Sequence, residues 1–397
     1  MRHFSTMTSH ELDGLFALPP TEFNEASDQR VISDALGAML YTRGTHPGLA
    51  SVLERQKQVG TTSVVVCLED AIGQHEVALA HANLSSALRE LSQRPQEATP
   101  LLFCRVRHPS EILKVCAEDT RRRIVGFVIP KYSAQNGSQW LAAVRQAADA
   151  RGCQVWAVPV LESGELADPL RRSQWLEQTR DSVDANRDVV LSLRIGAVDI
   201  LGSLGLRRTR NLTSYDYGPL RDAISAIVGA FAGDREHGLA TSGCVWEHFS
   251  GTGRGPLSSG SPRISLPESE GLAADPLRAR FGALVDELTL DRAHGLVGKS
   301  AIHPTQVPVI NAWQAVTHEE YADATGVHES EGATPSPYGN KMNEALPHRL
   351  WAERTVRRAK VFGVLRRRRT HRDLVGALAP IDVGRTSDGA IPSAETQ

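Results

Sequence analysis

Eight short apolar runs rich in β-branched residues alternate along this chain with longer amphipathic segments. The runs are residues 38–42, 63–68, 101–106, 124–130, 154–161, 189–195, 239–246 and 295–302. Continuous apolar runs of this kind are typical of parallel strands that are buried on both faces. The segments between them follow a helical pattern at residues 48–60, 76–94, 109–122, 138–152, 166–186, 219–233 and 275–290. This alternation predicts an α/β fold, a (β/α)8 TIM barrel, with an open doubly wound sheet as the alternative.

The pattern also divides the chain. We expect an N-terminal extension over residues 1–30 and the barrel over residues 31–325. Residues 326–380 are predicted to form a C-terminal helical lid segment that includes a basic amphipathic helix at 351–365, and residues 381–397 a disordered tail. Two loops are expected, a Gly-, Ser- and Pro-rich one at 251–270 after the seventh strand and another at 326–337.

Charge and cysteine content restrict the classes of partner and compartment. The 397 residues carry 44 Lys and Arg against 46 Asp and Glu, and the five cysteines form no CxxC motif. A disulfide framework is therefore not expected, and the absence of an apolar leader or membrane span predicts a cytoplasmic protein. Near-neutral charge predicts no nucleic-acid or membrane partner. Nucleic-acid binding through the basic run Arg354–Arg372 is an alternative, and we favour a solvated helix face or an inter-subunit contact.

Polar or ionisable side chains come directly after every apolar run. In strand order they are Arg43 and His46, Glu69 and Asp70, Arg105 and Arg107, Lys131, Glu162, Asp199, Glu247, and Ser300 with His303. Any one strand can end in a polar residue because it reaches water there. In a TIM barrel, however, the carboxyl ends of all strands converge on one rim, which carries the active site.

The most informative pair in this set is Glu162 and Asp199. They come after the fifth and sixth strands, which are neighbours in a barrel. Two carboxylates with open positions for water and substrate oxygens suit Mg²⁺, although the same residues could simply cap helices. Arg105 and Arg107 alternate on one strand, so only one can point into the barrel, and we choose Arg105 as a clamp for a substrate carboxylate.

A phosphate-binding interpretation of Gly298-Lys299-Ser300 does not hold. The P-loop motif requires a glycine where Ala293 stands and a helix that begins at the lysine, whereas Ile302-His303-Pro304 comes next in this chain.

Several segments together resemble those of the HpcH/HpaI aldolase/citrate lyase superfamily, which includes citrate lyase β-subunits and malyl-CoA lyases. In chain order they are Val65-Val66-Cys67-Leu68-Glu69-Asp70-Ala71-Ile72, Arg105-Val106, Pro130-Lys131, Leu161-Glu162-Ser163, Gly196 with Asp199, Gly298-Lys299 with Ile302-His303-Pro304-Thr305-Gln306, and Gly339-Asn340-Lys341-Met342-Asn343-Glu344. The strings at 67–72, 205–208 and 340–344 look most like a divergent branch of citrate-lyase-like TIM-barrel C–C bond lyases.

The resemblance implies a TIM barrel that forms a homotrimer or other homo-oligomer, with a C-terminal segment covering a neighbouring subunit's site. It implies a Mg²⁺-dependent carbon–carbon lyase or aldolase that acts on a small oxoacid or an acyl-CoA-like thioester. The implied site residues are Glu162 and Asp199 as Mg²⁺ ligands, Arg105 as carboxylate clamp, Glu69 and Asp70 around the metal-bound water or a proton relay, and Glu344 from the lid. Lys131, Arg43 and His303 are further candidates for substrate binding.

Aldol-type cleavage leaves an enolate, which a Mg²⁺ ion stabilises as a Lewis acid. The general base stays open between Glu69, Asp70, His46 and a metal-organised water. A Schiff base through Lys131 is a weaker alternative. A barrel repurposed to bind a ligand or partner without catalysis is the alternative function, because Cys67 and Arg107 depart from the family's pattern.

Overall fold

Eight parallel strands form the centre of the molecule. The computed structural model describes residues 1–233, 238–249 and 281–378. The strands are β2 (Ala38–Arg43), β3 (Ser63–Cys67), β4 (Leu101–Arg105), β5 (Ile124–Ile129), β6 (Trp156–Leu161), β7 (Leu193–Ile195), β8 (Thr241–Ser242) and β9 (Lys299–Ala301). They pair in the order β8-β7-β6-β5-β4-β3-β2-β9. Each of the eight coincides with one of the predicted runs.

The sheet curves round into a nearly closed barrel, which confirms the TIM-barrel prediction over the open sheet. Its two edges meet at a parallel bridge between Gly243 and Lys299. Gly298 lies at this seam with a φ of 70°, where a Cβ atom would collide with the backbone of Gly37. Glycine at this position lets β9 approach β2 closely. The Gly-Lys-Ser segment therefore leads into a strand. A P-loop would lead into a helix, so the structure agrees with our rejection of that motif.

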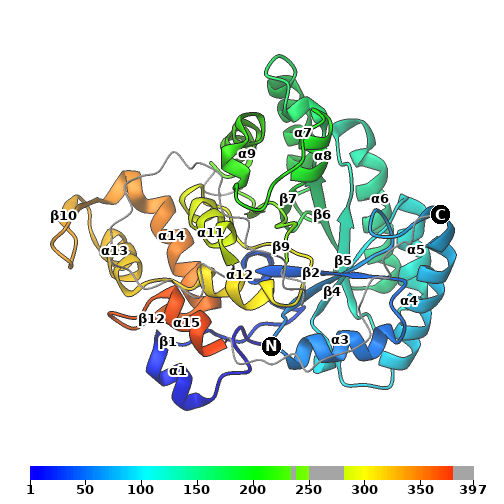
Figure 1. Ribbon diagram of the computed structural model, residues 1–397, viewed down its shortest axis with the longest axis horizontal. Helices are drawn as coiled ribbons and strands as arrows, with labels where there is room; N and C mark the ends of the chain where they lie inside the picture. The colour runs from blue at the N-terminus through cyan, green and yellow to red at the C-terminus, as the bar shows by residue number, and fades with distance from the viewer. Residues whose placement is uncertain (234–237, 250–280, 379–397) are drawn as a thin grey trace.

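Helices cover the outside of the barrel (Figure 1). They are α3 (Leu49–Gln58), α4 (Val77–Leu91), α5 (Pro109–Glu118), α6 (Ala134–Arg151), α7 (Arg172–Asp184), α9 (Gly218–Phe231), α11 (Ala283–Ala293) and α12 (Gln306–Gln314), with the short α8 (Ala197–Gly202) after β7. Two starts differ from the prediction by four residues or more, and the predicted start of the helix at 275–290 lies outside the described residues. Helix α6 begins four residues early because Ser133 and Asn136 form a capping box, and α7 begins late because residues 164–166 form a separate 3-10 turn.

The C-terminal segment packs beside the barrel (Figure 1). Helix α13 (His318–Glu329) leads to a hairpin of β10 (Ala333–Pro335) and β11 (Met342–Glu344), then to α14 (Ala345–Phe362), β12 (Val364–Leu365) and α15 (His371–Leu378). The predicted loop at 326–337 is therefore wrong in part. The basic helix also begins and ends earlier than predicted. The predicted loop at 251–270 and tail at 381–397 lie outside the described residues.

The N-terminal residues pack against this same segment. They form α1 (Ser9–Leu15), β1 (Phe16–Leu18) and α2 (Gln29–Ala35), and β1 pairs antiparallel with β12. No helix in the described ranges is both long and apolar enough to cross a membrane.

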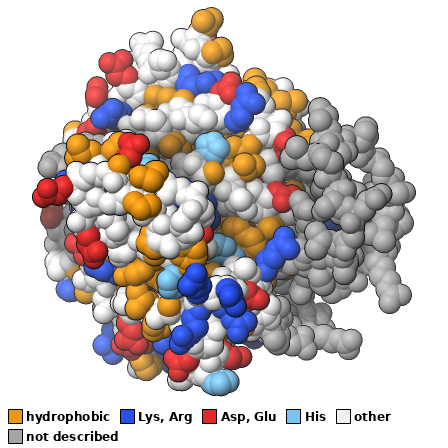
Figure 2. Space-filling model, turned by 90° about the vertical axis from the view of Figure 1, so that its left-hand side faces the viewer, with side chains coloured by type: hydrophobic (Ala, Val, Ile, Leu, Met, Phe, Trp, Pro, Cys, Tyr) orange, Lys and Arg blue, Asp and Glu red, His pale blue; other side chains and the backbone are white. Residues whose placement is uncertain are grey.

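Three of the four arginines of α14 contact the protein body. Arg357 pairs with Asp34 at 3.0 Å, Arg358 lies 3.5 Å from Glu320, and Arg354 donates to the carbonyl of Ala232. Figure 2 faces this side of the molecule and shows its lysines and arginines among acidic and apolar side chains. These contacts favour a structural role for this part of the basic run over nucleic-acid binding.

Candidate active site

Six of the predicted residues gather at the carboxyl ends of five neighbouring strands. Glu69 and Asp70 come after β3, Arg105 ends β4, and the remaining three come after β5, β6 and β7. Those three are Lys131, Glu162 and Asp199. Because adjacent parallel strands bring their ends to one rim, residues far apart in sequence meet here.

Arg105 lies at the centre of the carboxylates. Its Nη2 is 2.6 Å from Glu69 Oε2, 2.9 Å from Asp70 Oδ2 and 3.8 Å from Glu162 Oε1. Burial favours the neutral guanidine, but the groups around it, with Tyr41 and Glu162 first, raise the pKa of Arg105 above its ordinary value. A permanent positive charge is therefore fixed in the barrel mouth.

Arg107 contacts backbone carbonyls and not the clustered carboxylates, as the alternation of side chains along the strand predicted. It donates to the carbonyl oxygens of Leu68, Glu69 and Ile72, at 3.1, 2.9 and 2.8 Å. It thereby fixes the turn after β3 that presents the two acidic side chains. The sequence alone indicated no role for this residue.

Lys131 is held in a left-handed backbone conformation, with φ of 50°. For a residue other than glycine, this costs on the order of 1–3 kcal/mol. The turn directs its backbone N–H to Glu162 Oε1 at 2.7 Å and its Nζ to Glu69 Oε1 at 3.2 Å. Burial acts to lower the pKa of Lys131, but Glu69 and Asp70 outweigh it and raise that pKa. A protonated amine is a poor nucleophile, so the Schiff-base alternative loses support.

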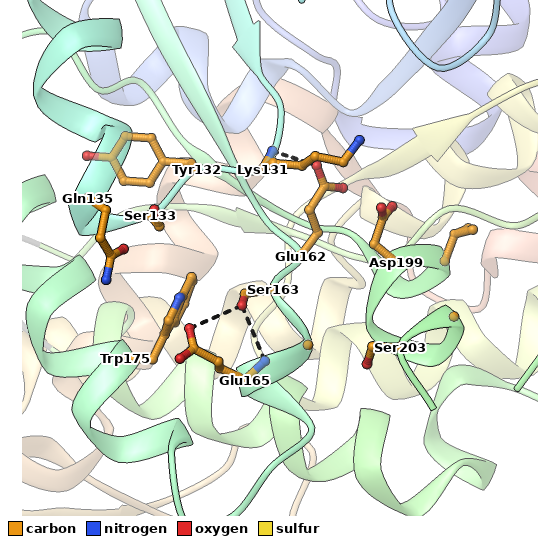
Figure 3. Close-up of a pocket in the computed structure, with 13 residues that line it drawn as sticks. Lys131, Tyr132, Ser133, Gln135, Glu162, Ser163, Glu165, Trp175, Asp199 and Ser203 are labelled. Atoms are coloured by element: carbon orange, nitrogen blue, oxygen red, sulfur yellow. Dashed lines mark hydrogen bonds between the residues drawn. The ribbon is translucent and has the colours of Figure 1, made fainter. Parts of the chain in front are cut away.

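Glu162 and Asp199 lie side by side at the ends of the neighbouring strands β6 and β7 (Figure 3). Glu162 is 5% exposed. Burial first, and then the charge of Asp199, raise its pKa to about 7. A Cβ atom on Gly196 would collide with the Glu162 side chain, so glycine is needed there to bring α8 and its aspartate close.

This pair fits a magnesium ion. A buried carboxylate beside a second one is destabilised by like charge, and a divalent cation removes that penalty. In the described residues no three His, Cys, Asp or Glu side chains form a metal-holding group. A site with two protein carboxylates and open positions is one that Mg²⁺ accepts.

A hollow of about 640 Å³ opens beside the carboxylate pair. Besides Glu162 and Asp199, its wall includes Trp175, Ser133 and Glu165 (Figure 3). Glu165 accepts from the hydroxyl of its neighbour Ser163 at 3.4 Å. The hollow offers a mixed apolar and hydroxyl-lined space for the part of a substrate that does not react.

Three predicted residues lie apart from the cluster. Arg43 ends β2 with an exposed side chain. His303 stacks on Phe249, with ring centroids 4.9 Å apart. Glu344 is exposed on β11, and its backbone N–H donates to His348. In the described part of the chain, none of the three has a hydrogen bond or ion pair to the six clustered residues.

Comparison with known proteins decides the family. The model of a family described as C–C bond lyase of the TIM-barrel fold matches residues 30–364. The chain belongs to this family. It is therefore a carbon–carbon lyase, as the resemblance implied, and the non-catalytic alternative is not supported.

Solved structures agree with the fold of this lyase. A citrate lyase from Burkholderia xenovorans LB400 superposes with a TM-score of 0.59 at 16% identity, covering 88% of this chain and 99% of that one. CitE from Mycobacterium tuberculosis, in complex with magnesium, acetoacetate and coenzyme A, gives a TM-score of 0.50 at 18% identity, with 82% and 99% coverage. No curated protein matches the sequence.

Proposed function

We propose that this lyase cleaves or forms a carbon–carbon bond in a small oxoacid or acyl-thioester by a Mg²⁺-dependent enolate mechanism. The observation that carries the proposal is the adjacent pair of carboxylates, Glu162 and Asp199, next to the cation of Arg105. The structurally similar CitE was crystallised with magnesium, which supports the same ion here. Mg²⁺ bound by the two carboxylates would supply Lewis-acid stabilisation of the developing negative charge.

Arg105 would hold the substrate carboxylate by charge-assisted hydrogen bonds. Its existing contacts with Glu69 and Asp70 fix the guanidinium before substrate arrives, which reduces the entropy lost on binding. Lys131 would add a second positive charge at the same rim.

The base that removes the hydroxyl proton would be Glu69. Burial raises its pKa, whereas the pKa of Asp70 is lowered because Glu69, Arg105 and Lys131 together outweigh its own burial. A carboxylate with a raised pKa is the better proton acceptor near neutral pH. Asp70 would then serve to orient Arg105 and Lys131.

Titration calorimetry with Mg²⁺ tests the metal pair. Glu162→Ala and Asp199→Ala should each abolish binding. Glu165→Ala, which removes a carboxylate from the wall of the same hollow, should leave it intact. Unchanged Mg²⁺ affinity in both of the first two variants would refute the metal site.

The hairpin of β10 and β11 would carry Glu344 to the site of a neighbouring copy. Support comes from its separation from the cluster within one chain and from the exposed apolar side chains Met342, Leu346 and Trp351 nearby. If so, an inactive Glu344→Ala chain mixed and reassembled with an inactive Glu162→Ala chain should recover activity. No recovery in confirmed mixed oligomers would contradict a shared site.

A further inference from the structure

An arginine-lined hollow lies at the end of the barrel opposite the candidate active site. Its volume is about 540 Å³, and its wall includes Leu239 and Ala240 before β8, Gly295 and Val297 before β9, and one side of α14. These segments come before their strands, whereas the residues of the candidate active site come after theirs. Because the strands are parallel, the two sites lie at opposite ends of the barrel.

Four arginines line this hollow, from two helices that lie side by side (Figure 1). Arg354, Arg357 and Arg358 belong to α14, where spacings of three and four residues put them on one side of the helix. Arg292 comes from the last turn of α11. In the described part of the chain the hollow has two carboxylates to face these four cations. Positive charge is therefore in excess.

Both carboxylates are already engaged. Glu320 accepts hydrogen bonds from Arg292 at both of its oxygens, each at 2.7 Å. Asp34 accepts from Arg357 Nε at 3.0 Å. Burial raises the pKa of Asp34, while the charges of the three α14 arginines act to lower it, so all three lie near this one carboxylate.

The other two arginines lack such a partner among the described residues. Arg358 is 14% exposed, its Nη2 lies 3.5 Å from Glu320, and its Nε is buried without a hydrogen bond. Arg354 donates to the carbonyl oxygen of Ala232 and forms no ion pair with a described residue. A Cβ atom at Gly295 would lie 3.9 Å from Arg354 Nη1, so this guanidinium extends to the loop before β9.

Burial without enough counter-charge destabilises these cations. Burial first, and then the charge of Arg292, lower the pKa of Arg358 to about 10, although Glu320 opposes them. Burial and Arg357 lower the pKa of Arg354 in the same way. A bound anion would remove this cost, because the guanidinium fork matches the oxygens of an oxyanion.

We propose that this hollow binds a small molecule that carries phosphate. A phosphate group has about two negative charges near pH 7, enough to balance the two arginines without a carboxylate partner. Trp351 is 39% exposed at the wall and provides an aromatic face for stacking. The volume is in the range of small-molecule sites. The proposal is independent of the proposed function, because it uses none of the residues at the carboxyl ends of the strands.

Calorimetry in metal-free buffer of low ionic strength tests the site, with pyrophosphate and ADP as probes. We expect both to bind the wild-type protein. Arg354→Gln and Arg358→Gln should each weaken binding roughly 10- to 100-fold, the range for a hydrogen bond to a charged group. Arg145→Gln removes a surface arginine that pairs with Asp188 and should change nothing. Arg105→Gln should also bind as wild type does, which places the anion away from the candidate active site.

The two probes distinguish the sources of phosphate. A higher affinity for ADP that Trp351→Ala reduces to that of pyrophosphate would identify the ligand as a nucleotide. Equal affinities would show that the phosphate groups alone are recognised. Both results support the site.

Circular dichroism establishes which variants fold. Arg354→Lys keeps the charge and loses the fork, so it should bind with intermediate affinity and decides the matter if the glutamine variants do not fold.

The inference is overturned if neither probe binds the wild-type protein, or if the folded α14 variants keep its affinity. Loss of binding in Arg105→Gln alone would also overturn it, because the anion would then lie at the candidate active site. A changed oligomeric state in the α14 variants, without phosphate binding by the wild type, would instead assign these arginines to a contact between copies.

Discussion

Glu162 shows how burial beside a second carboxylate can prepare a side chain for metal binding. Its carboxyl is enclosed at the end of β6 beside Asp199, and its pKa is raised to about 7. A proton and a metal ion therefore compete for the same oxygens near neutral pH.

Magnesium affinity should accordingly depend on pH. Below about pH 7 the Glu162 carboxyl binds a proton that Mg²⁺ must displace, so the dissociation constant should rise about tenfold for each further unit of acidity. Calorimetric titrations at about pH 5.5, 6.5, 7.5 and 8.5 span that pKa and measure the effect. An affinity that stays flat across the acidic half of this range would show that Glu162 does not bind the metal.

Arg105 should not tolerate replacement by lysine. Arg105→Lys keeps the positive charge but loses the planar fork that can hold two carboxylate oxygens. We expect kcat/KM for the substrate to fall roughly 10- to 100-fold. Mg²⁺ affinity should change little, which steady-state kinetics and calorimetry together would establish. A kcat/KM equal to that of wild type would remove the clamp assignment.

Among the elements, β9 and α11 are joined by a fully buried ionic network. Lys299 Nζ contacts Glu287 at 2.7 Å and Asp291 at 2.8 Å, and Arg208 pairs with Glu287 at 2.5 Å. Two cations meet two carboxylates here, so the network is balanced in charge. It fixes helix α11 against the seam of the barrel.

Removing one charged side chain from this network should greatly reduce the stability of the fold. Lys299→Met leaves Glu287 and Asp291 with one cation between them, and we expect the free energy of unfolding to fall by about 3–5 kcal/mol. Arg221 is a control, because it and its partner Asp222 both have side chains that are more than half exposed. Arg221→Met should cost about 1 kcal/mol or less. Urea denaturation followed by circular dichroism compares the two, and equal losses would contradict the ranking.

The elements also show which features sequence patterns carry. The barrel strands were predictable because burial on both faces leaves an unbroken apolar run in each. The hairpin of β10 and β11 was not, because three-residue strands in a polar segment have no periodic pattern. Helix starts shifted where capping side chains such as Ser133 overrode the apolar pattern.

In the candidate site, too, sequence patterns predict some features and not others. Six rim residues could be predicted from their positions directly after the strands, since barrel geometry alone brings those positions together. The role of Arg107 was missed because its partners are backbone carbonyls of the turn after β3, and no pattern of residue types indicates such contacts. The position of Glu344 depends on how the C-terminal segment packs, which no local pattern specifies.

For the molecule as a whole, the protonation of His3 makes folding stability depend on pH. The ring stacks on Phe362 at 4.2 Å and bonds the carbonyl of Ala35 at 3.0 Å, so it joins the N-terminal residues to α14 and α2. Burial lowers its pKa from 6.5 to about 3. The folded protein holds this histidine neutral, whereas the unfolded chain protonates it below pH 6.5.

Stability should therefore fall as pH drops from 6.5 towards 3. At about pH 5 the protonation of His3 alone should favour the unfolded state by about 2 kcal/mol. His3→Gln, which can still donate to the Ala35 carbonyl, should lack this share of the pH dependence. Urea unfolding of both proteins at about pH 7.5, 6 and 5 gives the comparison. Parallel stability profiles for the two would contradict it.

The pairing of β1 with β12 bears on the order in which the molecule assembles. These two short strands come from opposite ends of the described chain, so the link between them closes a very large loop. During synthesis, the barrel strands emerge long before Val364 and Leu365 can meet residues 16–18. We therefore expect the pairing of β1 with β12 to be among the last contacts that form. Until it forms, Phe16 should stay exposed on a barrel that has already folded.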